Sequence, residues 1–269
     1  MRCLILCLFV ALLHADQVTV DGREVFVAAP EQVQPTAILL WLHDDRIGAK
    51  EDCAYWQRNG VVSRGVVVVC PSLRHKAWHN FQDRPLVFAL LQRLRETTGL
   101  PRERVLIGGV GSGAEFAQHL ALARPQDFAA CLIARGGDGG RWPETEGHEL
   151  PIFGIYGNVN DEHVPIKSLR AIEKRLRRLG IMVRWQSALH GEVLGAECAN
   201  LMMDLIRALE IPLDQPAIGA LDLAAVADPE PEPELIKPVD QPDIIVRVPP
   251  GGVGGLTPAP VPAGFPQAE

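Results

Sequence analysis

The stretch that decides the fold is Arg104-Val105-Leu106-Ile107-Gly108-Gly109-Val110-Gly111-Ser112-Gly113-Ala114-Glu115-Phe116-Ala117. It begins as a continuous apolar run, passes through closely spaced glycines, and continues with apolar residues at helical spacing. A run that is apolar on both faces is typical of a buried parallel strand, and clustered glycines mark a tight turn. The stretch therefore predicts a strand over residues 104–109 that turns sharply into a helix.

Outward from this turn, short apolar runs alternate with helical patterns. The runs that predict strands are residues 37–42, 66–70, 104–109, 128–134, 152–156 and 181–187. The apolar stripes that predict helices are Val87, Leu90, Leu91 and Leu94; Leu169, Ile172, Leu176 and Leu179; and Cys198, Leu201, Met202, Leu205 and Leu209. Upstream, Asp21-Gly22 separates two alternating runs, as in a type I′ hairpin. This order predicts an α/β fold with a mostly parallel, doubly wound sheet and an N-terminal β-hairpin.

The first fifteen residues are organised like an export signal. Met1-Arg2 precedes an uninterrupted apolar run, residues 3–13, and Ala15 supplies the small residue at the cut. Eleven apolar residues are too few to cross a bilayer core of about 30 Å. We therefore expect residues 1–15 to be a cleaved signal peptide and the mature chain to be secreted or periplasmic, without stable membrane insertion. The alternative is an N-terminal core helix.

The composition changes at Pro212. Residues 212–269 hold 13 of the 22 prolines, and they carry 9 acidic against 2 basic side chains. Such a segment buries too little apolar surface to offset its ordering entropy. We expect residues 16–211 to form one α/β domain and residues 212–269 to be a disordered acidic tail, serving as a solvated linker or, alternatively, as a partner-binding arm.

Charge is distributed unevenly along the chain. The tail alone accounts for the net charge of −7, which leaves the preceding residues neutral. Without a basic surplus to neutralise phosphates, nucleic acid is not an expected partner. The basic run over residues 174–178 falls on the outer face of a predicted helix, and we expect it to be a solvated surface.

Cysteine and histidine usage gives no sign of a metal. Four cysteines follow the predicted signal peptide: Cys53, Cys70, Cys131 and Cys198. Export would permit disulfides, but the sequence selects none of the three complete pairings, and the apolar surroundings of Cys70 and Cys131 favour buried thiols. The sequence contains neither CxxC nor HExxH, and His75 and His79 lie in a predicted loop. We expect no metal and no other cofactor.

The glycine turn matches two known kinds of turn. Gly109-x-Gly111-x-x-Ala114 satisfies the GxGxxA fingerprint, in which a helix N-terminus receives a pyrophosphate. Two strand–helix units precede the motif, however, and the next strand leads to Arg135, where an NAD site would have an acidic residue. A dinucleotide-binding protein is therefore one alternative.

The second kind of turn is the nucleophile elbow, small-x-nucleophile-x-small. Four ordered features accompany it: His43-Asp44 after the first core strand, the glycine turn, Asp161 after a later strand, and His190 after the last strand. In this order the chain resembles the α/β-hydrolase superfamily, especially compact secreted esterases of the feruloyl-esterase and polyhydroxybutyrate-depolymerase type. The resemblance covers about residues 35–210. It implies an α/β-hydrolase fold and carboxylic-ester chemistry.

The chain differs from this family at the position of the nucleophile. With Gly109 and Gly113 as the two small residues, Gly111 stands where the family has the attacking side chain. The resemblance implies that Asp161 and His190 are the acid and base, and that His43, Asp44 and the amide of Ser112 form the oxyanion region. Without a hydroxyl to activate, the family's mechanism fails. We therefore predict an impaired hydrolase, a pseudoenzyme whose cleft binds a small-molecule or ester-bearing ligand.

Two alternatives stay open for these residues. If the strand ran one residue longer, Ser112 would be the nucleophile of an active esterase with His190 and Asp161, at the cost of placing Val110 where the turn favours a small residue. Asp161 also precedes a predicted helix, so it is either the acid or a helix cap.

Overall fold

The computed structural model describes residues 16–73, 77–78, 80–137, 142, 150–161, 163–188 and 194–215, except for the side chains at 80 and 81. All of these belong to the first of two compact units, Met1–Glu230; the second, Pro231–Glu269, lies outside the described residues. The expected signal peptide and all but four residues of the expected tail also lie outside them. None of the described helices combines the length and apolarity needed to cross a membrane.

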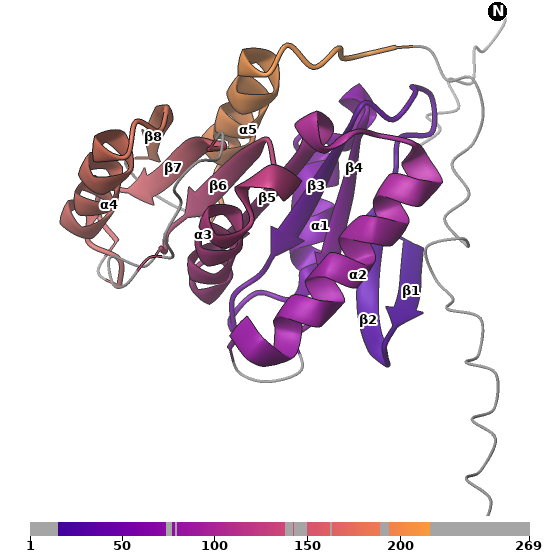
Figure 1. Ribbon diagram of the computed structural model, residues 1–269, viewed down its shortest axis with the longest axis horizontal. Coiled ribbons are helices and arrows are strands. Elements are labelled where there is room, and N and C mark those ends of the chain that lie inside the picture. Colours follow the sequence, from indigo (N-terminus) through magenta and orange to yellow (C-terminus); the bar gives the residue numbers. More distant parts are fainter. Residues whose placement is uncertain are drawn as a thin grey trace, which may run out of the picture. The chain divides into compact units, whose positions relative to one another are not determined.

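The described residues form one eight-stranded sheet with helices on both faces (Figure 1). Its order is β1-β2-β4-β3-β5-β6-β7-β8, and every pairing from β4 onward is parallel. The strands are β1 (Asp16–Val20), β2 (Arg23–Ala28), β3 (Ala37–Leu42), β4 (Val66–Pro71), β5 (Val105–Val110), β6 (Ala130–Ala134), β7 (Ile152–Asn158) and β8 (Val183–Ala188). The predicted mostly parallel sheet is therefore confirmed, with strand ends shifted by one or two residues.

The N-terminal hairpin is also confirmed. β1 and β2 pair antiparallel, and Asp21 and Gly22 between them have φ angles of 51° and 70°. Two consecutive left-handed residues define the type I′ turn, which suits the twist of the strands. β2 then pairs antiparallel with β4 and joins the hairpin to the parallel sheet.

Helices cover the two faces unequally. The α-helices are α1 (Ala49–Arg58), α2 (Asn80–Thr98), α3 (Ser112–Ala123), α4 (Ile166–Arg178) and α5 (Ala196–Ala208). Single 3-10 turns lie at Val62–Arg64, Arg102–Arg104 and Pro125–Asp127. Residues of α2, α3 and α4 share one apolar cluster, whereas residues of α1 and α5 share the other. The apolar stripes predicted α2, α4 and α5 but did not single out α1, whose buried face includes Asp52 and Gln57.

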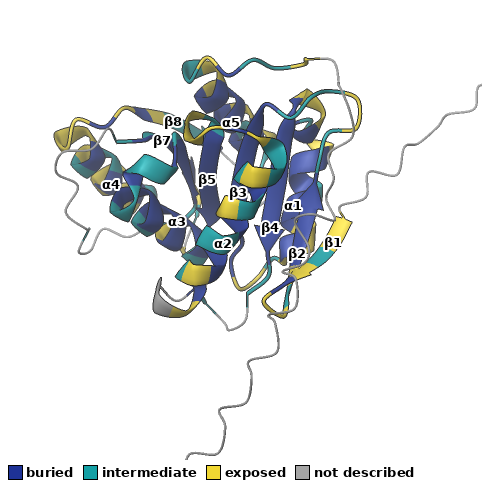
Figure 2. Cartoon of the chain, turned by 45° about the vertical axis from the view of Figure 1, so that its right-hand side comes forward, coloured by how far each residue is buried: buried dark blue, intermediate teal, exposed yellow. Residues whose placement is uncertain are grey.

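Burial follows from this layering. β3, β4, β5 and β6 are buried at every position, as expected for strands covered on both sides, whereas β1 and the edge strand β8 are partly exposed (Figure 2). Parallel strands end at a common edge, so the residues that follow β3, β5, β6 and β7 gather there. This edge is where an open α/β sheet binds its ligands.

The four described residues of the expected tail are attached to the domain. The Gln34 amide donates to the Gln215 carbonyl at 2.8 Å, and the Asp214 amide donates to the Arg64 carbonyl at 3.3 Å. The four cysteines after residue 15 are buried and unpaired, in agreement with the interpretation of Cys70 and Cys131 as buried thiols.

Candidate functional site

Gly111 forms the apex of the turn between β5 and α3. Its φ and ψ angles are 55° and −121°, a combination that only glycine adopts without strain. The Gly111 amide donates to the Ala134 carbonyl at 3.1 Å, and its own carbonyl accepts the Ala114 amide at 3.1 Å. The backbone is therefore fixed on both sides of the apex, in a conformation that would strain any residue with a side chain, as in a strand-to-helix elbow.

The neighbouring glycines bring α3 against the sheet. A Cβ at Gly109 would overlap the backbone of Gly113, and a Cβ at Gly113 would overlap the backbone of Leu42 in β3. Both positions therefore face protein backbone, and Ala114 is completely buried. Close helix–strand packing thus accounts for Gly109 and Ala114, and the apex conformation accounts for Gly111, so the three positions of the dinucleotide fingerprint are explained without a ligand.

The Asp44 side chain lies directly beside the apex. A Cβ at Gly111 would come within 2.9 Å of Asp44 Cβ and 3.1 Å of Asp44 Oδ2. The carboxylate is held in place because its Oδ1 accepts the amides of Arg46 at 2.8 Å and Ile47 at 2.9 Å. Asp44 is buried. A side chain at position 111 would therefore meet a fixed carboxylate.

His43 is part of the scaffold of this loop. Its Nε2 accepts the Leu73 amide at 3.1 Å, which requires Nδ1 to carry the proton and donate to the Asp44 carbonyl at 2.6 Å. Burial lowers the pKa of His43, so the neutral ring is favoured. Trp78 Nε1 donates to the His43 carbonyl at 2.7 Å. These bonds orient the loop that carries Asp44.

Ser112 is the first residue of α3. β5 does run to Val110, one residue beyond the predicted end, but the chain reverses at Gly111, and Ser112 is already helical. Ser112 Oγ is buried and has no hydrogen-bond partner among the described residues. A hydroxyl in this setting is not presented to solvent at the edge of the sheet.

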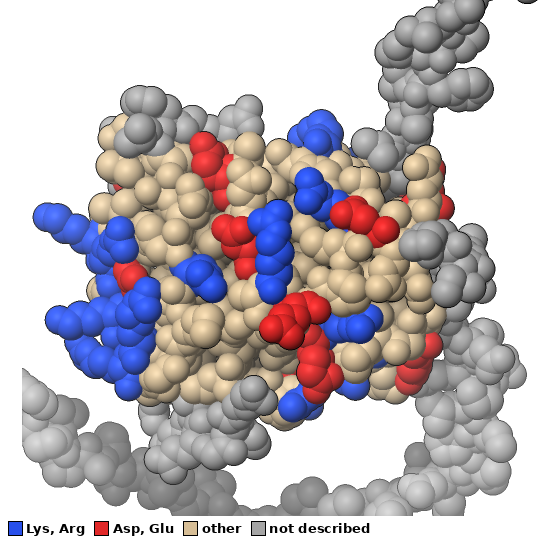
Figure 3. Space-filling view, turned by 90° about the horizontal axis from the view of Figure 1, so that it is seen from above, with Lys and Arg blue, Asp and Glu red and all other residues tan. Residues whose placement is uncertain are grey.

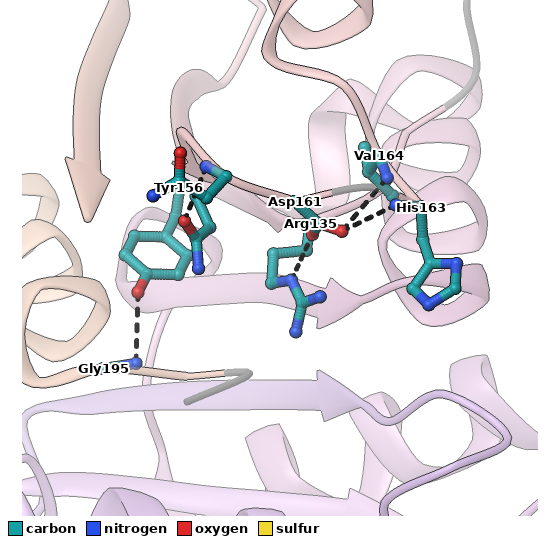
Figure 4. Close-up of polar contacts among 8 residues, drawn as sticks. Arg135, Tyr156, Asp161, His163, Val164 and Gly195 are labelled. Atoms are coloured by element: carbon teal, nitrogen blue, oxygen red, sulfur yellow. Dashed lines mark hydrogen bonds and ion pairs between the residues drawn. The ribbon is translucent and has the colours of Figure 1, made fainter. Parts of the chain in front are cut away.

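Asp161 is bound by Arg135, for which the sequence predicted no role in the site. Arg135 Nε donates to Asp161 Oδ2 at 2.5 Å, and the amides of His163 and Val164 donate to Oδ1 at 2.9 and 3.2 Å (Figure 4). Burial acts to raise the pKa of Asp161, but these three bonds outweigh it and hold the pKa below its ordinary value. The amides belong to the turn before α4, which begins only at Ile166.

The histidine expected to partner Asp161 cannot be placed against it, because His190 lies outside the described residues, as do His75 and His79. Figure 4 shows the imidazole of His163 turned away from the Asp161 carboxylate. Within the described ranges, then, the carboxylate has an arginine and two backbone amides as partners. The role of His190 stays a prediction.

Two tyrosines fix the start of α5, the helix that follows the segment containing His190. Tyr55 donates to the Gly195 carbonyl at 2.7 Å and accepts the Ala199 amide at 3.1 Å. The Gly195 amide donates to the Tyr156 hydroxyl at 3.1 Å. The Tyr156 hydroxyl satisfies the N-cap amide of Gly195, which a helix leaves unpaired, and the Tyr55 hydroxyl bridges the Ala199 amide and the Gly195 carbonyl. No local sequence pattern predicts these bonds, because Tyr55 is far from α5 along the chain.

A small pocket of about 210 Å³ lies between the loop after β3, the β5–α3 turn and the residues that follow β6 and β7. Its lining is of mixed charge and includes Asp44, Arg46, Gly111, Ser112, Arg135 and His163. A larger cavity of about 680 Å³ lies elsewhere, between the later turns of α2 and the residues that follow α3. Within the part of the chain that the structure describes, no three His, Cys, Asp or Glu side chains are grouped to hold a metal ion.

The position of Arg135 in the sequence could have indicated its place in the site. It directly follows β6, and Asp161 comes shortly after the adjacent parallel strand β7, so their strand ends meet at one edge. The φ angle of Arg135 is 46°, in the left-handed region of backbone conformations. The sequence did not predict this conformation, because residues other than glycine, asparagine and aspartate seldom adopt it.

The comparisons with known proteins identify the fold. No protein-family model matches this sequence, and no curated protein is significantly similar to it. Among solved structures, the chain is similar to S-formylglutathione hydrolase from Staphylococcus aureus, with 14% identity and a TM-score of 0.53 over 70% of this chain and 91% of that one. It is also similar to a thermostable esterase, with 17% identity and a TM-score of 0.56 over 73% and 62% of the two chains.

A third similar structure is esterase 2 of Thermogutta terrifontis phosphonylated by cyclosarin, with 14% identity and a TM-score of 0.55 over 72% of this chain and 94% of that one. Together these structures show that the chain has the α/β-hydrolase fold, which confirms the fold that the sequence predicted.

Proposed function

We propose that this protein is an exported, non-catalytic relative of the carboxylic-ester hydrolases that binds a small ligand at the carboxyl edge of its sheet. The observation that carries the proposal is the apex of the β5–α3 turn. Gly111 has the backbone conformation of a nucleophile elbow but no side chain. The similar solved structures include esterases, which supports an ester-related ancestry for the site.

Loss of the nucleophile removes the first chemical step. Serine hydrolases need a hydroxyl that a histidine deprotonates, and backbone amides that stabilise the oxyanion. Here the corresponding space beside Gly111 is bounded by the Asp44 carboxylate. A negative charge next to a developing oxyanion raises the energy of the transition state. The glycine and the carboxylate therefore act in the same direction, against ester hydrolysis.

The acid position supports the same conclusion. In a working triad, the acid accepts a hydrogen bond from the histidine and stabilises its charged form. Asp161 is instead neutralised by Arg135, which weakens the field that it would exert on an imidazole. A lowered pKa keeps Asp161 ionised, but its charge is already compensated.

The pocket beside Gly111 is small. Its volume is about 210 Å³, and it shares Asp44, Asp45 and Arg46 with a neighbouring hollow of about 510 Å³. Its charged and polar lining suits a compact molecule with several hydrogen-bonding groups, such as a short-chain ester or a related carbonyl compound. We propose such a molecule as the ligand of the cleft.

The decisive experiment is labelling of the purified protein with a fluorophosphonate probe, together with turnover of p-nitrophenyl acetate. The unmodified protein should show neither. Gly111→Ser alone should gain little, because its Cβ meets Asp44, whereas Asp44→Gly/Gly111→Ser removes this contact and should gain labelling at position 111. Asp44→Gly alone is the matched control.

The second candidate function is an active esterase that uses Ser112, Asp161 and His190. Only the presence of a serine hydroxyl next to the elbow favours it, and the burial of Ser112 Oγ opposes it. Labelling of the unmodified protein that Ser112→Ala abolishes would establish this candidate and overturn the proposed function.

A further inference from the structure

One helix of the domain carries a concentrated positive charge. The exposed basic side chains of α4 and of the following edge strand are Lys167, Arg170, Lys174, Arg177, Arg178 and Arg184. We call this surface the α4 basic face. Figure 3 shows Lys and Arg side chains gathered at the left of the molecule, where α4 lies in Figure 1. The described residues before the tail are otherwise of mixed charge, so the concentration is local.

Neighbouring acidic groups neutralise only part of this charge. Glu173 pairs with Arg170 at 2.7 Å and with Arg177 at 3.1 Å. Among the described residues, Lys167, Lys174 and Arg178 have no carboxylate within ion-pair distance. A surplus of positive charge therefore faces solvent along the length of the helix.

Helix stability explains only some of these residues. Cations near a helix C-terminus favour the macrodipole, which accounts for Arg177 and Arg178 in the last turn. Lys167 is the second residue of α4, where the dipole disfavours a cation, and no acidic residue lies in the first turn. The α4 basic face therefore extends beyond what the helix itself requires.

Exposed apolar side chains border the α4 basic face. Leu179 directly follows α4 and is 44% exposed, and Met182 is 55% exposed. Their segment is held in place because the Ile181 amide donates to the Leu176 carbonyl at 3.1 Å and Arg177 donates to the Val183 carbonyl at 3.0 Å. Leu179 and Met182 are two of the three large apolar side chains exposed among the described residues.

We propose that the α4 basic face binds the surface of an anionic phospholipid bilayer, with Leu179 and Met182 entering the headgroup region. Clustered Lys and Arg attract anionic headgroups, and neighbouring exposed apolar side chains add burial that a purely polar polyanion does not offer. The positive charge of the α4 basic face favours an anionic partner. The exposed Leu179 and Met182 favour a lipid surface over other anionic partners.

This mode of binding leaves the candidate site accessible. α4 runs from the carboxyl edge of the sheet, where Asp161 lies, back toward the opposite edge, where Leu179 and Met182 lie. The apolar anchor and the pocket near Gly111 are therefore at opposite edges. Membrane binding by the α4 basic face does not depend on whether the pocket is catalytic.

The test is co-sedimentation of the full mature chain with phosphatidylcholine vesicles, with and without phosphatidylglycerol. We expect binding only to the anionic vesicles, and weakening by salt. Each basic residue near an anionic surface strengthens binding about fivefold, so Lys174→Gln/Arg178→Gln should bind ~30-fold more weakly. Leu179→Ser/Met182→Ser should bind about tenfold more weakly at the same charge.

The matched control is Lys50→Gln/Arg58→Gln, which removes the same charge from exposed positions on α1, on the other face of the sheet. It should change binding less than about threefold. Equal loss in this control, equal binding to neutral vesicles, or full binding by Leu179→Ser/Met182→Ser would overturn the proposal. Retention on heparin without vesicle binding would also overturn it and indicate a polysaccharide partner. Thermal unfolding should be unchanged in all three variants.

Discussion

The pKa values of two buried carboxylates in this domain are shifted in opposite directions. Asp161, after β7, has a side chain that is 1% exposed, and its pKa lies below the ordinary value. Asp52, on α1, is also 1% exposed, and desolvation raises its pKa to about 7. Burial acts in the same direction on both groups. The difference is in their partners.

Asp161 receives a charged guanidinium and two backbone amides, whereas Asp52 receives one neutral donor, Trp41 Nε1, at 2.7 Å. The charges of Asp44 and Glu51 raise the pKa of Asp52 further. The comparison teaches that desolvation decides the protonation of a buried carboxylate only where hydrogen bonds and opposite charges are too few to compensate it.

The largest effect is expected from removing Asp161. Asp161→Ala leaves Arg135 without its counter-charge and frees the amides of His163 and Val164, so the free energy of unfolding should fall by about 4 kcal/mol. Denaturant unfolding measures this loss. The control is Asp127→Ala, which breaks a pair with the 41% exposed Arg124 and should cost under about 1 kcal/mol. Equal losses in the two variants would contradict the comparison.

The next effect is a dependence of stability on pH. Because the folded-state pKa of Asp52 is raised to about 7, its contribution is complete below the unfolded value near pH 4 and is lost as the pH rises through 7. The loss should be about 4 kcal/mol, because each pH unit between the ordinary pKa of 3.8 and the raised value of about 7 corresponds to about 1.4 kcal/mol. Asp52→Asn should abolish it, while its amide oxygen still accepts from Trp41.

The measurement for Asp52 is the difference in unfolding free energy between the unmodified protein and Asp52→Asn across this pH range. The difference is needed because His43, whose pKa is lowered, contributes in the opposite sense, with stability lost as the pH falls through its unfolded value. Asp161 likewise contributes above about pH 4 and loses its contribution at lower pH. A difference that does not change with pH would contradict a raised pKa for Asp52.

The smallest expected change in stability distinguishes the backbone strain at Arg135 from the loss of its ion pair. Arg135 has a φ angle of 46°, a region that costs a residue with a Cβ about 1 kcal/mol relative to glycine. Arg135→Gly and Arg135→Ala both lose the ion pair with Asp161, but the glycine variant should be more stable by about 1 kcal/mol. Chemical denaturation of both variants gives the difference. The opposite order would show that the backbone is not strained there.

Much of the fold followed from local sequence. The apolar run before Gly111 and the stripes of α2, α4 and α5 are periodic, and a periodic pattern predicts burial. The exception is Leu179, the last residue of the α4 stripe, which follows the helix and is 44% exposed. α1 was not singled out, because its buried Asp52 and Gln57 interrupt the apolar stripe. Their burial depends on partners from elsewhere in the chain, such as Trp41 for Asp52.

The candidate site was predicted less completely. Gly111, Ser112, His43 and Asp44 were singled out by their positions after strands, and the structure brings all four to one edge. The partner of Asp161 was not predicted, because a resemblance to the hydrolases suggests a histidine there and no local pattern indicates Arg135.

The sequence by itself determined that a strand ends in a glycine turn and that no hydroxyl stands at position 111, because both are properties of a short contiguous stretch. Only the tertiary structure decided that Asp44 bounds the space beside Gly111 and that Arg135 neutralises Asp161. These contacts arise because adjacent parallel strands end at a common edge, whatever the distance between them along the chain.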